Sequence, residues 1–410
     1  MRLSKKLKVI NDPVYNSVSV PSDLLFDVIS HPYFQRLRRI TQMGLSYLVY
    51  PGAHHTRFHH ALGAMHLMQK AIGVLKSKGV PFTEEEEEGL LLAILMHDIG
   101  HGPFSHALEY KLVPLHHEAL TLAYMKALNT VFDQRLTTAI AIFKGEYPRT
   151  FLNQLVSSQL DIDRLDYLKR DSFYAGVTEG NINAERLINT FAVVDDRLVV
   201  EEKAIYSVEK FLMARRFMYW QVYLHKTSIV AELMLSRAIE RASELIRSGV
   251  ELTVDEPLKG FISGLNGELG NGEPPTKAML DAFAQLDDID ILSALKKWAV
   301  SEDFVLSFLS SSILNRSLLE VRFSEQPVTT QFYEETCEQV ASTFKLSREE
   351  AVYLVYTGTL WNRAYDASKE PIRILFRDGS VEDFIKASRY LGTPAFLATH
   401  EKNYICAPAL

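Results

Sequence analysis

The ten residues 97–106, HDIGHGPFSH, place three histidines and one aspartate directly after an apolar run. Imidazoles and carboxylates grouped in this way are the side chains from which metal sites are built. The chain has thirteen histidines, and eleven of them lie between His31 and His117. One histidine on a helix is more often a hydrogen-bonded structural residue, but a cluster of this density indicates a site that binds a metal ion or transfers protons.

The spacing inside this stretch predicts that its polar side chains converge. His97 and His101 are four residues apart and would share one face of a helix, with Asp98 displaced by about 100°. Adjacent His97 and Asp98 can both bind one ion when the end of their helix points at it. We expect the glycines and the proline that follow to end the helix and fix the turn, so that His101 and His106 fold back over the same point.

The elements that would position these residues are mainly helices, because apolar residues recur at three- and four-residue intervals. Helices are predicted at 58–77, 84–99, 117–130, 132–144, 150–158, 160–174, 205–248, 279–299 and 346–357. Thr83 is expected to cap the second of these, with the acidic run 84–88 as its solvated first turn.

Strand signals are few. TFAVVDDRLVVEE (190–202) predicts a hairpin, and PIRILFRDGSVEDF (371–384) predicts a strand, an Asp-Gly turn and a helix. The segment 391–408 could supply two more short strands, and 264–277 is the best candidate for a linker or surface loop. The sequence therefore predicts a mainly α fold with a small mixed α/β C-terminal part.

Composition narrows the function classes. The net charge of −7 over 410 residues argues against a protein whose surface as a whole binds nucleic acid or anionic membranes. Two cysteines, Cys337 and Cys406, suit a reducing compartment rather than a disulfide framework. No apolar run reaches the roughly 18 residues of a membrane span, and the first residues lack the apolar region of a signal peptide. We expect a cytoplasmic protein.

HDIGHGPFSH resembles the signature of HD-domain phosphohydrolases, in particular the deoxynucleoside triphosphate triphosphohydrolases, which include bacterial enzymes and the SAM-and-HD-domain enzyme of animals. Four further stretches resemble the same family in the same order: HPYFQRLRRITQMG (31–44), YPGAHHTRFHHALG (50–63), LDIDRLDYLKRD (160–171) and YLHK (223–226). The resemblance implies an HD phosphohydrolase domain with a helical core over residues 1–250. It leaves 251–410 as a C-terminal helical and small α/β region.

The resemblance implies that His60, His97, Asp98 and Asp163 bind one divalent metal ion per active site. Two imidazoles and two carboxylates suit six-coordinate Mn²⁺, Fe²⁺ or Mg²⁺ better than tetrahedral Zn²⁺, although Zn²⁺ and Ni²⁺ are alternatives. Such an ion would polarise a phosphoryl oxygen and lower the pKa of a bound water. His59 departs from the family pattern and is expected not to bind the ion.

Four further residues match catalytic positions of the family. His106 and Glu109 resemble its catalytic dyad, in which a carboxylate orients an imidazole for proton transfer near neutral pH. His101 and His117 match histidines that contact or polarise the phosphates. His117 would also begin a helix whose positive end favours phosphate.

The family pattern also implies a set of substrate contacts. They are Gln42, Arg57, Arg164, Tyr167, Asp171, Arg215, Tyr223 and Lys226. The three arginines and the lysine would neutralise phosphates, Gln42 would contact the 3′ side of the sugar, and the aromatic rings would face sugar or base. Tyr219 is open between a place in this site and a place in the helix core. His55 is equally open between the site and a bracing role.

These residues imply hydrolysis of a deoxynucleoside triphosphate to deoxynucleoside and inorganic triphosphate. The alternatives are an HD-type enzyme acting on a cyclic nucleotide or an alarmone, or a nucleotide-sensing or nucleic-acid-binding regulator with weak catalysis. By resemblance we expect a homo-oligomer, a dimer or tetramer, with a nucleotide activator in addition to the nucleotide substrate.

The activator site of the family is altered here. Gln35 and Arg38 match the segment that, in the animal enzyme, holds a guanine nucleotide between subunits, but Ser30 occupies the position of the guanine-reading aspartate. A hydroxyl cannot accept the paired hydrogen bonds that a carboxylate takes from guanine, and this loss costs about 1.5–3 kcal/mol, or about ten- to a hundredfold in affinity. Alternatively, Gln35 and Arg38 only brace their helix.

We therefore predict that GTP is not a required activator, although another deoxynucleotide could stimulate the enzyme through Arg38. The measurement is the hydrolysis rate of each deoxynucleoside triphosphate alone and in pairs, with and without GTP. An enzyme that is silent until GTP is added would contradict this expectation.

Overall fold

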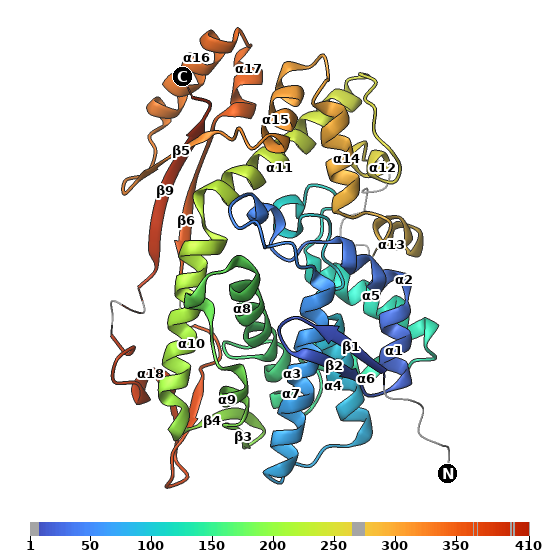
Figure 1. Cartoon of the computed structure of the whole chain (residues 1–410), viewed down its shortest axis with the longest axis vertical. Coiled ribbons are helices and arrows are strands. Elements are labelled where there is room, and N and C mark those ends of the chain that lie inside the picture. The colour runs from blue at the N-terminus through green and yellow to red at the C-terminus, as the bar shows by residue number, and fades with distance from the viewer. Residues whose placement is uncertain are drawn as a thin grey trace.

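The computed structural model describes residues 8–264, 275–363, 365–366, 368–393, 396 and 398–409. Most of the predicted linker at 264–277 therefore lies outside the described residues. The fold is mainly helical, as predicted, and its small sheets lie at the periphery (Figure 1). Within the described ranges, none of the helices combines the length and the apolar character that crossing a bilayer requires.

Three helices form the centre of the first part: α3 (Arg57–Ser77), α4 (Glu84–Met96) and α8 (Ile162–Ala175). The helices around them are α1 (Asp23–Ser30), α2 (Pro32–Gln35), α5 (His117–Val131), α6 (Thr137–Lys144), α7 (Thr150–Val156) and α9 (Ala184–Ile188). Short 3₁₀ turns connect them at η1 (Arg36–Arg39), η2 (Gly44–Leu48), η3 (Ser105–Leu108), η4 (Thr178–Gly180) and η5 (Glu202–Ala204). The helices predicted between residues 58 and 174 all occur, with shifted ends.

Helix α4 begins with the predicted cap. The Thr83 hydroxyl accepts a hydrogen bond from the Glu86 N–H (3.1 Å), and the Glu86 carboxylate accepts one from the Thr83 N–H (2.9 Å). Glu86 was expected to be solvated but is buried, and its carboxylate forms an ion pair with the Arg149 guanidinium at 2.8 Å. Residues 90–96 are all buried, so the helix end that precedes His97 is held on every side.

The helix predicted over 205–248 is interrupted. Helix α10 (Ile205–Met218) continues into one π-helical turn, η6 (Tyr219–Tyr223), and α11 (Lys226–Arg247) then starts as a separate helix. The break is stabilised by His225, whose ring nitrogen accepts a hydrogen bond from the Thr227 N–H (3.2 Å). Lys226, expected one turn further along the same face as Tyr223, therefore belongs to a new helix.

Two hairpins flank the helical centre. Strands β1 (Lys8–Asp12) and β2 (Asn16–Val20) form one, and β3 (Phe191–Val194) and β4 (Arg197–Glu201) form the hairpin predicted at 190–202. Strand β7 (Arg373–Leu375) pairs parallel to β4 and extends the second hairpin into a sheet of order β3-β4-β7-β8.

Three C-terminal predictions were wrong in detail. After the Asp-Gly turn the chain forms a strand, β8 (Val381–Asp383), before the short helix α18 (Phe384–Ala387), because the turn returns it alongside β7. The predicted helix 346–357 is one turn, α17 (Arg348–Ala351), then the 3₁₀ turn η7 (Val352–Leu354) and the strand β6 (Tyr356–Asn362). One long strand, β9 (His400–Ala407), replaces two short ones.

Tertiary pairing explains these differences. Strand β9 lies between β5 (Glu320–Ser324) and β6, antiparallel to both, so each strand gains a partner that is distant in the sequence. The Tyr-, Thr- and Trp-containing segment of β6 pairs well in such a sheet, and this outweighs the helical spacing of apolar residues before it.

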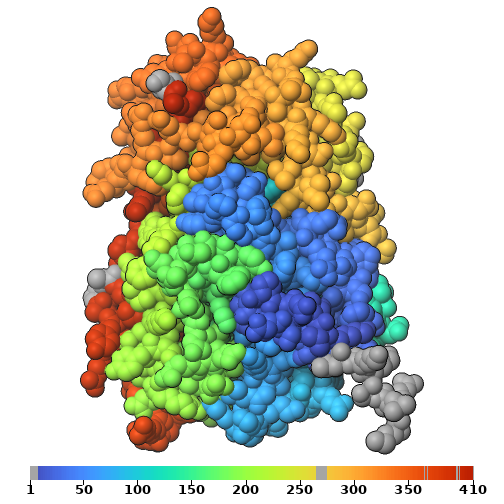
Figure 2. All heavy atoms as spheres, viewed as in Figure 1, coloured from blue at the N-terminus to red at the C-terminus, as the bar shows by residue number. Residues whose placement is uncertain are grey.

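The remaining helices pack over the top of the molecule in the view of Figure 1. They are α12 (Leu258–Ile262), α13 (Lys277–Phe283), α14 (Asp288–Trp298), α15 (Phe304–Leu314) and α16 (Thr330–Phe344). The predicted helix 279–299 divides into α13 and α14 because the Asp287 carboxylate caps α14, accepting a hydrogen bond from the Ile289 N–H (2.9 Å). Figure 2 shows this C-terminal part in direct contact with residues 31–50 on the face in view.

Candidate functional site

The four predicted metal ligands meet where the three central helices come together. His60 lies on α3, His97 and Asp98 directly follow α4, and Asp163 lies in the first turn of α8. His60 Nε2 is 3.1 Å from Asp163 Oδ1 and 3.2 Å from His97 Nε2. His97 Nε2 is 3.4 Å from Asp163 Oδ1 and 3.5 Å from Asp98 Oδ1.

The ligand atoms of His60, His97 and Asp163 fit one divalent ion, and Asp98 Oδ1 lies 3.5 Å from His97 Nε2 beside them. Neighbouring ligand atoms of a six-coordinate ion with bonds of about 2.1 Å are about 3.0 Å apart, close to the spacing of these nitrogens and oxygens. Burial would raise the pKa of Asp98, but His97, Arg57 and His101 hold it well below its usual range. Burial would also raise the pKa of Asp163, but His60 and His97 lower it, so both groups are ionised carboxylates.

A second layer of contacts orients His60. Its Nδ1 lies 2.8 Å from the buried Asp166 carboxylate, which places the proton on Nδ1 and leaves Nε2 for the ion. Asp166 also binds Arg170 (2.9 Å), and Arg170 binds Asp12 at the end of β1 (2.8 Å). Burial alone would lower the pKa of His60, but Asp163 and Asp166 raise it to about 10. A metal ion must therefore displace a proton here.

The turn after α4 differs from its predicted form. The helix ends at Met96, one residue before His97, and the His97 carbonyl accepts a hydrogen bond from the Thr121 hydroxyl of α5 (3.1 Å). A Cβ on Gly100 would lie 2.2 Å from the carbonyl oxygen of His117. Gly100 is therefore needed for the close approach of α5 and not to end the helix.

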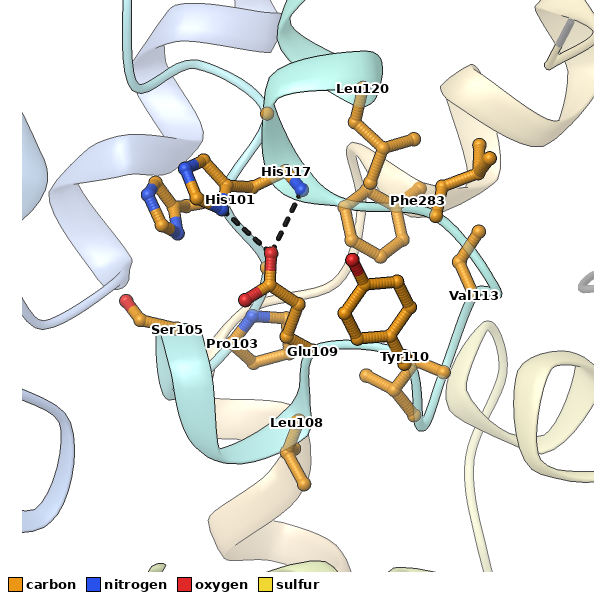
Figure 3. A pocket seen from close by; sticks show the side chains of 14 residues that line it. His101, Pro103, Ser105, Leu108, Glu109, Tyr110, Val113, His117, Leu120 and Phe283 are labelled. Atoms are coloured by element: carbon orange, nitrogen blue, oxygen red, sulfur yellow. Dashed lines mark hydrogen bonds and ion pairs between the residues drawn. The ribbon is translucent and has the colours of Figure 1, made fainter. Parts of the chain in front are cut away.

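Three histidines and Glu109 form a second cluster beside the first. His101 stacks on His117 with ring centroids 3.9 Å apart, and His101 Nε2 is 3.4 Å from Asp98 Oδ1. The Glu109 carboxylate lies 2.7 Å from His117 Nδ1 but 3.3 Å from His106 Nδ1, and Figure 3 shows it turned toward His117. The glutamate is thus shared between two imidazoles instead of serving His106 alone.

The electrostatics favour neutral rings at His101 and His117. Burial lowers the pKa of His117, although Glu109 opposes the shift. Burial and the nearby Arg57 hold the pKa of His101 well below its usual range. His106 has 66% of its side chain exposed and is therefore the histidine of this group that is most open to a ligand.

A cavity of about 410 Å³ opens in front of both clusters. It is lined by Gln42, Met43, Gly44, Ser46, Arg57, Asp98, His101, Phe104, Ser105, His106, His117, Asp163, Arg164, Tyr167, Asp171, Tyr219, Tyr223 and Glu232. The side-chain oxygens of Gln42 and Tyr167 are buried and have no hydrogen-bond partner among the described residues. Such atoms indicate a place for a polar ligand.

Two cations, Arg57 and Arg164, line this cavity. Arg57 binds the carboxylate of Asp98 and donates to the Ser105 hydroxyl (2.8 Å), so its guanidinium is fixed beside the metal ligands. Arg164 donates to the Ser158 carbonyl (2.8 Å), which directs its side chain along the start of α8.

Asp171 forms another part of the cavity wall. Its carboxylate accepts a hydrogen bond from the Tyr223 hydroxyl (2.7 Å) and lies 2.7 Å from His55 Nε2. His55 is buried and stacks on Tyr174 with centroids 4.4 Å apart. His55 therefore braces Asp171 from outside the cavity, and Tyr219 lines the cavity wall.

Some predicted site residues lie elsewhere. Lys226 is exposed at the start of α11 and does not line the cavity. Arg215 lies behind the wall, with its guanidinium over the Tyr219 ring at 5.5 Å. His59 points its Nδ1 toward the Thr56 N–H (3.1 Å) and caps α3.

The segment matched to the activator site contacts the neighbouring helices α1 and α3. The Gln35 amide donates to the Ile29 carbonyl (2.7 Å), and Arg38 donates to the Gln35 side-chain oxygen (2.9 Å). The Arg38 guanidinium also lies 3.6 Å from the centre of the Phe58 ring.

The comparisons agree with this geometry. The families described as HD domain and HD associated region match residues 57–171 and 182–252. The chain is 32% identical to the uncharacterized protein YwfO of Bacillus subtilis, over 93% of this chain and 88% of that protein. A phosphohydrolase crystal structure from Bacteroides thetaiotaomicron is 46% identical, with a TM-score of 0.94 over 98% of this chain and 100% of that one. The chain belongs to the HD-domain phosphohydrolase family.

One further relative has a named activity. The deoxynucleoside triphosphate triphosphohydrolase SAMHD1 homolog of Dictyostelium discoideum is 29% identical over 86% of this chain and 75% of its own length. Family membership supports a hydrolase, and metal dependence is general among HD domains. The candidate ligand cluster His60, His97 and Asp163 agrees with that property.

Sequence reasoning missed Asp288, which lies beyond the matched HD regions but holds two cavity segments together. One of its oxygens accepts hydrogen bonds from the Thr41 N–H (2.8 Å) and hydroxyl (2.7 Å). The other accepts one from the Phe104 N–H (2.7 Å). Phe104 and Ser105 both have positive φ, at 49° and 48°, a strained conformation for residues other than glycine. Asp288 thus fixes the turn that leads into His106.

We predict that Asp166→Asn lowers metal affinity about 10- to 100-fold, because His60 loses the charged partner that orients it.

Asp98→Ala, which removes a proposed ligand, should abolish bound metal and hydrolysis while the protein stays folded. The measurement is metal content by elemental analysis and affinity by chelator competition. Glu118→Gln, at an exposed side chain of α5, is the control. Stoichiometric metal in Asp98→Ala would refute the ligand assignment.

We also predict that Asp288→Ala lowers kcat/KM about 10- to 100-fold, because the turn before His106 loses its anchor. Leaving the Phe104 N–H without a partner should cost about 1–3 kcal/mol of stability. Asp290→Asn is the matched control, since Asp290 accepts only from the Asp287 N–H of its own helix (2.8 Å). Unchanged kinetic constants in folded, metal-loaded Asp288→Ala would contradict the positioning role.

Proposed function

We propose that this HD-domain protein is a metal-dependent deoxynucleoside triphosphate triphosphohydrolase, which converts a deoxynucleoside triphosphate and water to deoxynucleoside and triphosphate. The observation that carries the proposal is the cavity of about 410 Å³ that is lined by two of the proposed metal ligands, Asp98 and Asp163, by two arginines and by aromatic side chains. Its volume lies in the range of small-molecule sites. The identity to the Dictyostelium triphosphohydrolase supports the same substrate class.

The residues of the cavity divide into a phosphate end and a nucleoside end. Arg57, Arg164 and the histidine cluster supply positive or hydrogen-bonding groups for the triphosphate. His60, His97, Asp98 and Asp163 would hold Mn²⁺, Fe²⁺ or Mg²⁺, with Zn²⁺ or Ni²⁺ as alternatives. When bound, the ion supplies Lewis-acid polarisation of a phosphoryl oxygen and activation of water.

We assign proton transfer to the Glu109 cluster. Glu109 holds His117 from one side and His106 from the other, so either imidazole can be oriented by the same carboxylate. The exposed His106 protonates the leaving 5′ oxygen, and His101 and His117 contact the phosphates. This assignment keeps the acid on the open side of the cavity.

The deoxyribose is assigned to the wall around Asp171. Tyr223 and Asp171 are already hydrogen-bonded to one another, and the unpartnered oxygens of Gln42 and Tyr167 face the same cavity. A sugar hydroxyl can satisfy such groups. Arg215 would act through Tyr219, and Lys226 would need to reach substrate from outside the cavity.

The wider proposal follows the family. It includes a homo-oligomer, either a dimer or a tetramer, a nucleotide activator other than GTP, a cytoplasmic location and a division of the chain near residue 250. Hydrolysis of a cyclic nucleotide or an alarmone is the competing activity, because the HD fold supports several phosphohydrolase reactions.

Attack of water at the α-phosphorus predicts deoxyguanosine and triphosphate as the first products from dGTP. Chromatography of a digest with Mn²⁺ or Mg²⁺ measures this directly, and in ¹⁸O-labelled water the label should enter triphosphate. A first product of deoxyguanosine monophosphate would refute the mechanism. Turnover of guanosine tetraphosphate or cyclic nucleotides, with the four deoxynucleotides inert, would refute the substrate class.

A further inference from the structure

The turn directly after α4 is held by side chains from outside it. The backbone carbonyls of residues 96–99 each accept a hydrogen bond, as the last carbonyls of a helix must when they are buried. Two of these bonds come from the Ile99 and His101 N–H groups of the turn itself (2.9 and 3.2 Å). The other two come from distant segments, the Thr121 hydroxyl (3.1 Å) and the Arg36 guanidinium (2.7 Å).

Arg36 is an unusual donor for such a bond because its side chain is completely buried. Its Nη2 donates to the Ile99 carbonyl, whereas its Nε and Nη1 have no hydrogen-bond partner among the described residues. The guanidinium carbon lies 5.4 Å from the ring centres of both Tyr124 and Phe283. Aromatic rings at this distance attract a cation, so the two rings fix the guanidinium beside the turn.

The position of Arg36 is costly for the stability of the protein. Burial lowers the pKa of Arg36, although Tyr124 and Asp287 oppose the shift. The guanidinium nevertheless stays protonated, and the Asp287 carboxylate is itself paired with Arg39. An apolar side chain of the same length would avoid the desolvation of this charge. A side chain that lowers stability in this way indicates a functional role for the one hydrogen bond that it makes.

That bond fixes one peptide unit of the turn, the unit between residues 99 and 100. Arg36 binds its carbonyl oxygen, and the Thr121 hydroxyl accepts a hydrogen bond from its N–H (2.9 Å). Because a peptide unit is planar, contacts at both of its polar groups define its orientation. Asp98 precedes this unit and His101 follows it, so the orientation of the unit determines where both side chains start.

We infer that Arg36 is a positioning residue for the metal-dependent reaction, which orients the 99–100 peptide and through it the Asp98 carboxylate and the His101 ring. Arg36 is not among the residues that line the cavity, so it acts without touching the substrate. The inference rests on the proposed function for its kinetic measurement. Its second measurement, metal affinity, depends only on Asp98 as a proposed ligand.

The first test is Arg36→Met in the full-length protein, because methionine is also long and unbranched but has no charge and no N–H donor. We expect kcat for dGTP to fall about 10- to 100-fold with KM within about twofold, since the cavity side chains that bind substrate are unchanged. Metal affinity, measured by chelator competition, should fall about tenfold. The thermal midpoint should stay at or above that of the wild type, because an unpaired buried charge has been removed. A merely structural arginine would show the opposite pattern, a lower midpoint with an unchanged kcat.

Two further variants separate hydrogen bonding from packing. Arg36→Lys keeps a cation that can donate to the Ile99 carbonyl, so its kcat should exceed that of Arg36→Met by about fivefold. Arg39→Met makes the same change in the same 3₁₀ turn, at a side chain that is 45% exposed. As the matched control, it should leave kcat, KM and metal affinity within about twofold of the wild type.

Circular dichroism and elemental analysis confirm that each variant is folded and metal-loaded before its rates are compared. Unchanged kcat and metal affinity in folded Arg36→Met would overturn the inference, as would equal losses of kcat in Arg36→Met and Arg36→Lys. A wild-type protein that hydrolyses none of the four deoxynucleoside triphosphates would refute the proposed function. In that case a lower metal affinity of Arg36→Met would still support the positioning role of Arg36.

Discussion

The structure depends on holding the Asp98 and Asp163 carboxylates 3.1–3.8 Å from the His60 and His97 imidazoles at the junction of three helices. Two half-buried carboxylates in one site repel unless positive groups compensate them. Arg57 and the histidines do so on one side, and a divalent ion would complete the compensation.

The compensation extends outward from the ligands in a chain of alternating charges. His60 contacts Asp166, Asp166 contacts Arg170, and Arg170 contacts Asp12 at the edge of the first hairpin. This chain connects α3, α8 and β1 through buried groups, so a hairpin that provides no ligand still fixes the geometry of one. The apolar residues packed around α4 likewise fix the position of His97, which directly follows that helix.

The convergence of the proposed ligands could be predicted because these residues occur in short motifs whose order and spacing are recognisable. Asp163, Tyr167 and Asp171 line one cavity, as their four-residue spacing on a helix predicts. The same spacing rule does not extend from Tyr219 to Lys226, because a π-helical turn and the start of a new helix lie between them. Local spacing gives no warning of such a break.

Asp288 could not be found from the sequence. It is one acidic residue in a helix that reads as ordinary, and its role comes from contacts with segments 184 and 247 residues away. The strand β6 was misassigned for the same reason, since its partner β9 follows much later in the chain. Long-range pairing was the information that the sequence patterns lacked.

The hydrogen bonds that Asp288 accepts from Thr41 and Phe104 have a consequence for synthesis of the chain. All four proposed metal ligands are synthesised by residue 163, but the residue that fixes the turn before His106 follows 125 positions later in the printed sequence. At about 5–20 residues per second, the interval is on the order of ten seconds. A nascent chain therefore contains its proposed metal ligands well before its cavity can take the final shape.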